Sequence, residues 1–146
     1  MANKMNVHIS GESKGMQSVL KAGNHSITID EPPNMGGKDS GPDPLATLLS
    51  SLAGCENVVA NMVAKEIGFD LQGIEFDIKG VLDPRGLMGD PEVQPYFEKV
   101  TIHAKVKTSE APERIDELQE KTDKRCPVYT TLKAAGIELE PNWIKA

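Results

Sequence analysis

The sequence has few of the residues from which redox, metal and membrane sites are most often built. Its 146 residues include two cysteines, three histidines and one tryptophan, and aromatic residues make up only 4% of the chain. Leucine, isoleucine, valine and methionine must therefore fill most of the core. No apolar run approaches the roughly 18 residues that a membrane-spanning helix requires, so we expect no membrane partner.

The few cysteines and histidines are also too widely spaced to predict a metal site. Cys55 and Cys126 lie 71 positions apart, which excludes a CxxC redox motif and a zinc ribbon. The histidines, His8, His25 and His103, show no ligand spacing with one another or with the cysteines. We therefore expect neither a bound metal nor another cofactor.

The charge balance argues against nucleic acid as a partner. The chain carries 22 acidic residues against 16 Lys and Arg, a formal net charge of −6. A phosphate backbone would be repelled on average, and no cluster of basic residues forms a positive stripe. The length suits one domain over residues 1–146. No apolar secretory segment follows Met1, which favours a cytoplasmic protein.

The periodicity of apolar residues predicts an α+β fold. Period-two alternation predicts strands at 5–10, 16–22, 27–29, 74–82 and 100–106, and a short closing strand at 137–139. Helical spacing predicts helices at 44–67, 112–125 and 127–136. Prolines and glycines leave 31–44 and 83–95 irregular. The strands are grouped and do not alternate regularly with helices, which favours α+β over a doubly wound sheet.

The long helix carries the first candidate site residues. It is predicted to begin at Pro44 with Asp43 as its N-cap, and to end at Gly68. Cys55 projects beside its apolar stripe, and Glu56 projects into the middle of that stripe. A carboxylate there costs several kcal/mol unless it is paired or neutralised, which indicates an interface or a site. The alternative is a local rotation that lets Glu56 reach solvent.

Cys126 offers a second candidate, at the start of the last helix. Helix N-terminal amides, together with the neighbouring Arg125, would stabilise a thiolate there and lower the pKa of the thiol. The alternative is a small buried residue that packs the helix start. A peroxidatic and resolving couple would require Cys55 and Cys126 to meet in space, which their spacing alone does not show. The alternative is that they are two unrelated core residues.

Two motifs resemble the signatures of the OsmC/Ohr family. The first is GPDP at 41–44 followed by LLSSLAGC at 48–55, and the second is RCPV at 125–128 followed by LKAA at 132–135. Their separation and the order of elements agree with that family over nearly the whole chain. The resemblance implies an OsmC-like α+β fold, with antiparallel sheets around a long central helix. It also implies an intertwined homodimer with its active sites at the subunit interface.

The same resemblance implies a thiol peroxidase that reduces organic hydroperoxides and, in some members, hydrogen peroxide. Cys55 would be the peroxidatic cysteine, oxidised to a sulfenic acid. Cys126 would be the resolving cysteine, which condenses with it to a disulfide. An external dithiol would then reduce the enzyme.

The chain departs from the family at the residues that activate the first thiolate. Where the family has a glutamate early in the helix, this chain has Leu45 and Ala46, and no arginine occurs before Arg85. Lys38 or Arg85 would then supply the positive charge, although a lysine lacks the planar fork of an arginine. Glu56 would take the role of the carboxylate. The alternative is a stress-associated or apolar-ligand-binding protein of the same fold without efficient peroxidase activity.

Overall fold

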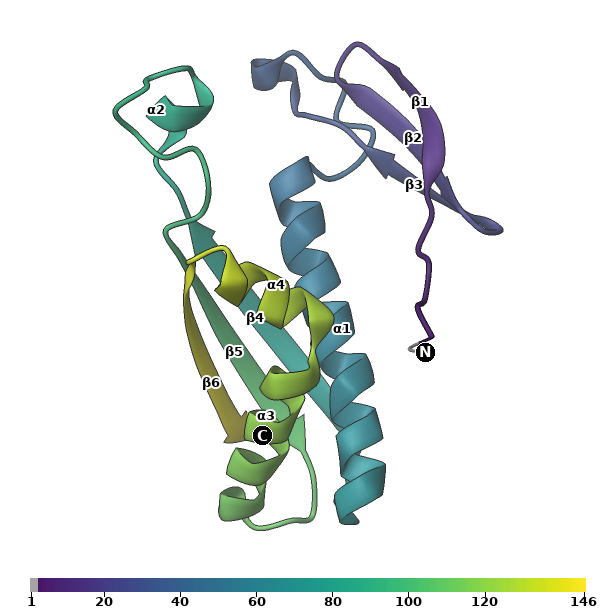
Figure 1. Ribbon diagram of the computed structural model, residues 1–146, viewed down its shortest axis with the longest axis vertical. Helices are drawn as coiled ribbons and strands as arrows, with labels where there is room; N and C mark the ends of the chain where they lie inside the picture. Colours follow the sequence, from purple (N-terminus) through teal and green to yellow (C-terminus); the bar gives the residue numbers. More distant parts are fainter. Residues whose placement is uncertain (1–2) are drawn as a thin grey trace. The chain divides into compact units, whose positions relative to one another are not determined.

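The computed structural model describes residues 3–146, which form two compact units divided after Leu48. The first unit holds an antiparallel sheet in the order β1-β2-β3, formed by β1 (Ser10–Lys14), β2 (Gln17–Ala22) and β3 (His25–Ile29) (Figure 1). The turns contain Gly15 and Gly23, whose φ angles of 60° and 62° are accessible to glycine without steric cost.

The strand predicted at 5–10 is wrong before Ser10. The residues preceding β1 have no regular structure, and Met5 and Val7 are 86% and 81% exposed. The register explains this, because β2 pairs with β1 from Lys14↔Gln17 to Ser10↔Lys21 and then turns away. Only Ala22 of β2 lies beyond this last pair, so the residues before Ser10 have no strand to pair with.

A buried carboxylate orders the irregular stretch that follows β3. Asp30 is only 1% exposed, and it accepts hydrogen bonds from the backbone N–H groups of Glu31, Lys38 and Ser40 and from the Ser40 hydroxyl. These bonds, with the Ser40 hydroxyl foremost, lower the pKa of Asp30 to about 2. The stretch also includes a single 3-10 turn, η1 (Pro33–Met35). The prediction that 31–44 is irregular is therefore confirmed except for this turn. The same prediction for 83–95 is wrong at α2 (Pro84–Leu87), a single helical turn that the Asp83 carboxylate caps by accepting from the Arg85 N–H.

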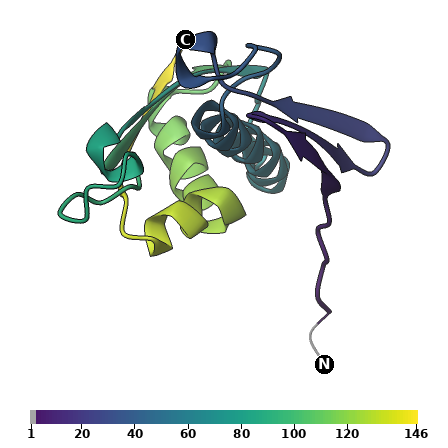
Figure 2. The same cartoon turned by 90° about the horizontal axis from the view of Figure 1, so that it is seen from above.

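The second unit has two layers, a sheet and the helices that cover one of its faces. The remaining elements are α1 (Pro44–Ile67), β4 (Gly73–Val81), α2 (Pro84–Leu87), β5 (Lys99–Lys107), α3 (Pro112–Arg125), α4 (Pro127–Ala134) and β6 (Glu138–Lys145). The sheet order is β4-β5-β6, antiparallel and then parallel. The part of α1 after Leu48 lies with α3 and α4 on the same face of this sheet (Figures 1 and 2).

The bounds of α1 agree with the prediction at both ends. The Asp43 carboxylate caps the helix by accepting from the Ala46 N–H at 2.9 Å. Gly68, with φ of 65°, ends it. Its inward face buries six residues: Leu52, Glu56, Val59, Ala60, Val63 and Ala64. None of the helices described between residues 3 and 146 is long and apolar enough to cross a membrane.

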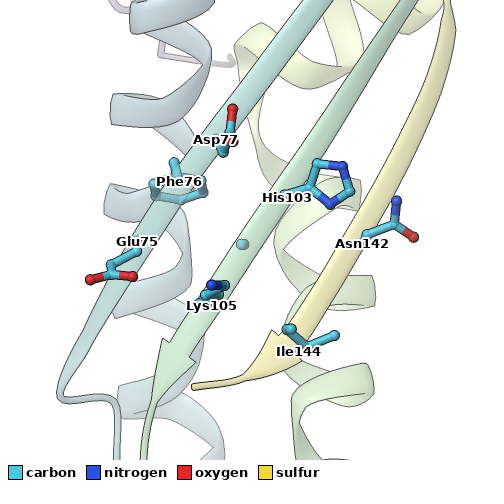
Figure 3. A pocket seen from close by; sticks show the side chains of 8 residues that line it. Glu75, Phe76, Asp77, His103, Lys105, Asn142 and Ile144 are labelled. Carbon is cyan, nitrogen blue, oxygen red and sulfur yellow. The ribbon is translucent and has the colours of Figure 1, made fainter.

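The two faces of the β4-β5-β6 sheet differ in chemistry. The inner face of β5 is fully buried at Val100, Ile102, Ala104 and Val106. The outer face is polar and carries a shallow hollow of about 380 Å³, whose lining includes Glu75, Asp77, His103, Lys105 and Asn142 (Figure 3). His103 is exposed there, as its position in the alternating pattern predicted.

The closing strand is longer than predicted. We expected strand only at 137–139, whereas β6 runs from Glu138 to Lys145 and pairs parallel with β5. β6 contains Pro141, which cannot donate a backbone hydrogen bond. It is tolerated because β6 lies at the edge of the described sheet, where one side needs no partner.

Candidate functional site

The two cysteines meet inside the second unit. The Sγ atoms of Cys126 and Cys55 are 2.9 Å apart, with the Cys126 thiol placed to donate to Cys55. A disulfide bond is about 2.05 Å long, so the two sulfurs are separate thiols. They lie close enough to form a disulfide after a small approach if an oxidant removes two electrons and the two thiol protons leave. The fold therefore brings together two residues whose proximity the sequence left open.

The two thiols differ in access. Cys126 is 0% exposed, whereas Cys55 is only partly buried on α1. Cys126 caps α4, where Pro127 begins the helix and the Tyr129 N–H donates to Cys126 Sγ at 3.4 Å. A molecule arriving from solvent therefore reaches Cys55 more readily than Cys126.

The prediction of a Cys126 thiol with a lowered pKa is wrong. Burial first, and then the hydrogen bond to Cys55, raise the pKa of Cys126 to about 12 against the smaller opposing effect of the Tyr129 N–H. Arg125 does not help, because its Nη1 donates to Glu66 Oε2 at 2.6 Å. The helix terminus is present, but desolvation of the thiolate outweighs it.

Glu56 stays inside the apolar stripe and does not rotate into solvent. The residue is 0% exposed, and neither carboxyl oxygen has a hydrogen-bond donor among residues 3–146. Burial, and next the neighbouring Asp123 carboxyl, raise the pKa of Glu56, while the Cys126 thiol offsets part of the rise. The carboxyl is therefore protonated near neutral pH.

Asp123 of α3 is a site residue that the sequence interpretation missed, since no acid pair was expected. It is 7% exposed, its Oδ2 accepts from Gln119 Nε2, and its Oδ1 has no partner among the described residues. Burial raises its pKa. The signal lay in helical spacing, because Asp123 follows the buried Ile115 by eight residues and so shares its side of the helix.

Cys55, Glu56, Asp123 and Cys126 together form what we call the thiol–carboxyl cluster. Tyr129 packs against it and is 7% exposed. Burial, followed by the charges of Asp123 and Glu56, raises the pKa of Tyr129 to about 12, so its phenol stays neutral. Two thiols within bonding reach beside two carboxyl groups can carry out thiol redox chemistry with proton transfer.

The two candidate cations lie elsewhere in the chain. Arg85 is engaged by Asp83, to which it donates from Nε at 3.0 Å and from Nη2 at 2.6 Å, and its side chain is 69% exposed. The structure therefore does not bring Arg85 into the thiol–carboxyl cluster. Lys38 belongs to the first unit, where its backbone N–H is bound to Asp30 and its side chain is exposed.

The sequence and the fold were compared with those of known proteins. Residues 37–142 match the OsmC-like protein family. A hydroperoxide reductase of Mycoplasma genitalium is 32% identical over 111 residues, which cover 75% of this chain and 73% of that protein. A hydroperoxide reductase of Mycoplasma pneumoniae is 29% identical over 112 residues, which cover 75% and 74%.

The fold has a counterpart of almost equal length. The crystal structure of an OsmC-like protein from Mycoplasma pneumoniae superposes with a TM-score of 0.77 at 21% identity, over 99% of each chain. This similarity shows that the two proteins share an α+β fold. Because the family match spans most of the sequence and both motifs lie within it, the chain belongs to the OsmC-like protein family, as its resemblance to OsmC/Ohr proteins predicted.

Proposed function

We propose that this protein reduces organic hydroperoxides with a pair of thiols, in which Cys55 attacks the peroxide and Cys126 resolves the product. The observation that carries the proposal is the 2.9 Å distance between the two Sγ atoms. Membership of a family that includes hydroperoxide reductases supports the choice of substrate.

The assignment of the two roles follows from access and protonation. Cys55 is the thiol that a peroxide can reach, whereas Cys126 is fully buried and its raised pKa keeps it protonated. The Cys55 sulfur attacks one peroxide oxygen, the O–O bond breaks, and the alcohol leaves after taking up a proton. Cys55 is thereby oxidised to a sulfenic acid.

Resolution and reduction complete the cycle. The Cys126 sulfur attacks the sulfenic sulfur, the S–S bond forms, the S–O bond breaks, and water leaves. An external dithiol then reduces the disulfide by thiol–disulfide exchange. A cytoplasmic location fits this scheme, because a reducing compartment keeps both thiols free between turnovers.

In this proposal the charge that activates Cys55 comes from Lys38, or from Arg85 after it has left Asp83 and swung in from its loop. The Lys38→Met and Arg85→Met variants keep much of each side-chain length and remove the cation. Loss of about tenfold or more in the rate of peroxide reaction in one variant would identify the activating residue, in keeping with a shift of one or more pKa units. Unchanged rates in both variants, beside a Lys79→Met control on β4, would exclude both.

The working unit in this proposal is a homodimer. On α1, Val58 and Met62 lie one helical turn apart and are 53% and 52% exposed. An apolar pair of this kind on a helix that also carries Cys55 suits an interface near the site. A second copy of the chain is the partner that the family resemblance implies.

Intact mass spectrometry tests the chemistry. The reduced protein is treated briefly with cumene hydroperoxide, alongside Cys55→Ser and Cys126→Ser. The parent should lose the mass of two hydrogens, and a sulfenic adduct should appear in Cys126→Ser only. An adduct in Cys55→Ser instead would reverse the two roles.

The second candidate function is binding of an apolar ligand without efficient peroxidase activity. It is favoured by one observation, that Arg85 is engaged by Asp83 while no arginine precedes it in the chain. Thiols that stay unchanged under the same peroxide treatment would support this alternative and overturn the peroxidase.

A further inference from the structure

Two buried carboxyl groups in the thiol–carboxyl cluster lack conventional partners. Glu56 has no donor for either oxygen, and Asp123 has none for Oδ1, among the described residues. Two ionised carboxylates at these positions would repel each other and leave buried acceptors unpaired. A single proton held between them removes one charge and supplies the missing hydrogen bond. The pair therefore carries one proton in its favoured state.

The pair also connects the thiols with the surface. Glu56 directly follows Cys55 on α1. Besides burial, the neighbouring Asp123 carboxyl and Cys126 thiol both act on its pKa, the first raising it and the second lowering it. Asp123 lines a solvent-open groove of about 500 Å³ between α3 and α4. Two lysines and a second acid, Lys124, Lys133 and Glu120, also line this groove. Glu56 thus lies next to Cys55 in the chain, and Asp123 lies at a groove that carries two cations and one further acid.

We propose that Glu56 and Asp123 share one proton and act as a relay between the buried Cys126 thiol and the groove between α3 and α4. The proposal rests on the thiol chemistry proposed above for Cys55 and Cys126. In this relay Glu56 exchanges a proton directly with a reacting thiol and is a catalytic residue, whereas Asp123 is a positioning residue that acts through Glu56.

The relay answers a need of the resolving step. Cys126 must lose its proton as it attacks the Cys55 sulfenic acid, although burial holds that proton tightly. The Cys126 proton passes to Glu56 while the Glu56 proton moves to Asp123. The reverse movement protonates the departing hydroxide, which leaves as water, so that no proton is gained or lost overall.

The same relay serves the return to the dithiol. When an external thiolate attacks the Cys55 sulfur of the disulfide, the S–S bond breaks and Cys126 leaves as a thiolate. A proton then enters from the groove through Asp123 and Glu56. The other groups that face Glu56 and Asp123 are Cys55 of α1 and two residues of α4, Tyr129 and Lys133. The positive charge of Lys133 favours the ionised form of Asp123.

Infrared spectroscopy tests the shared proton without any turnover. At pH 7 the reduced parent should show the C=O band of one protonated carboxyl. Glu56→Gln should lose that band, and Asp123→Asn should shift it because an amide replaces the carboxylate partner. Asp116→Asn, an exposed acid on the same helix, is the control and should keep the band unmoved. Absence of the band in the parent, or no shift in Asp123→Asn, would overturn the shared proton.

Rapid-quench mass spectrometry after one equivalent of cumene hydroperoxide tests the relay. In Glu56→Gln and Asp123→Asn, the sulfenic acid should persist and the disulfide should form on the order of 10²-fold more slowly than in the parent. Asp123→Glu should restore part of the rate, which a merely structural role would not explain. Disulfide formation at the parent rate in both variants would overturn the relay and leave the peroxidase standing. Absence of any sulfenic acid in Cys126→Ser would instead overturn the peroxidase, whatever the carboxyl band shows.

Discussion

The backbone N–H of Tyr129 donates to Cys126 Sγ at 3.4 Å, yet this contact with a helix N-terminus does not make the thiol acidic. The thiol is fully buried and also donates to Cys55, and both effects favour the protonated sulfur. The helix amide only moderates the rise in pKa. Cys126 therefore stays a neutral thiol beside Cys55, which is more accessible.

The first prediction concerns alkylation of the reduced protein. With a pKa of about 12, Cys126 at pH 8 has a thiolate fraction of about 10⁻⁴, roughly 10³-fold below that of an ordinary thiol. Iodoacetamide should therefore modify Cys55 first and leave Cys126 unmodified until the protein is unfolded. Peptide mapping of the singly alkylated species measures this. Equal labelling of the two cysteines in folded protein would contradict it.

The second prediction concerns Glu56 and the pH dependence of stability. The folded-state pKa is raised from 4.5 to about 9, chiefly by burial. Glu56 therefore ionises at lower pH in the unfolded chain than in the folded protein. Its protonated form contributes stability that is fully present below pH 4.5. This stability is lost as the pH rises toward 9. Glu56→Gln removes the ionisation. The stability of the variant relative to the parent should rise by about 2 kcal/mol between pH 5 and pH 7.

Urea unfolding of both proteins at pH 5, 6 and 7 provides the measurement. Glu113→Gln, an exposed glutamate of α3, is the matched control and should follow the parent at every pH. A constant difference between Glu56→Gln and the parent across this range would mean that Glu56 ionises normally in the folded protein.

The third prediction concerns the exposed apolar pair on α1. Glutamates at Val58 and Met62 would place like charges across a two-fold interface, which costs several kcal/mol. Sedimentation velocity should show a dimer for the parent and a monomer for the Val58→Glu, Met62→Glu double variant. Lys65→Glu, exposed on the same helix, should stay dimeric. A monomeric parent would remove the homodimer from the proposal.

The fourth prediction concerns the loop that contains Lys38. Hydrogen bonds from Ser40 and the neighbouring backbone lower the pKa of Asp30 from 3.8 to about 2, so this stabilisation is present above pH 3.8 and is lost as pH falls through 2. Asp30→Asn should have a lower melting temperature than the parent at pH 7. The difference between the two melting temperatures should disappear between pH 4 and pH 2. Asp39→Asn is the control, since Asp39 is exposed and asparagine tolerates its φ of 56°.

The elements with strong periodicity could be predicted from the sequence. α1 has a proline start, an aspartate cap and a glycine stop, and its bounds agree with expectation. The absence of a strand at 5–9 and the full length of β6 could not be predicted from the sequence. Both depend on which partner strand is available. The prediction of one domain over residues 1–146 stays a prediction, since the structure divides within α1 after Leu48. A single calorimetric unfolding transition would support it.

The residues of the candidate site could be predicted only in part. Both cysteines could be inferred from the motifs, and helical spacing placed Glu56 on the apolar stripe while leaving a rotation into solvent as the alternative. Arg85 was predicted but is bound to Asp83. Asp123 was missed because α3 carries many charged residues. In such a sequence, an acid at the edge of the buried face cannot be distinguished from an exposed acid. The pKa of Cys126 was misjudged because local sequence shows the helix terminus but not the depth at which the thiol is buried.

The 71 positions between Cys55 and Cys126 have a consequence for the oxidised protein. A disulfide between them would close a long loop and reduce the conformational entropy of the unfolded chain. This would raise the free energy of unfolding by about 4 kcal/mol. The same free energy would oppose reduction, displacing the potential of the couple by on the order of 90 mV. Protein in which peroxide has formed this disulfide would therefore resist unfolding and proteolysis until a strongly reducing dithiol reduced the bond.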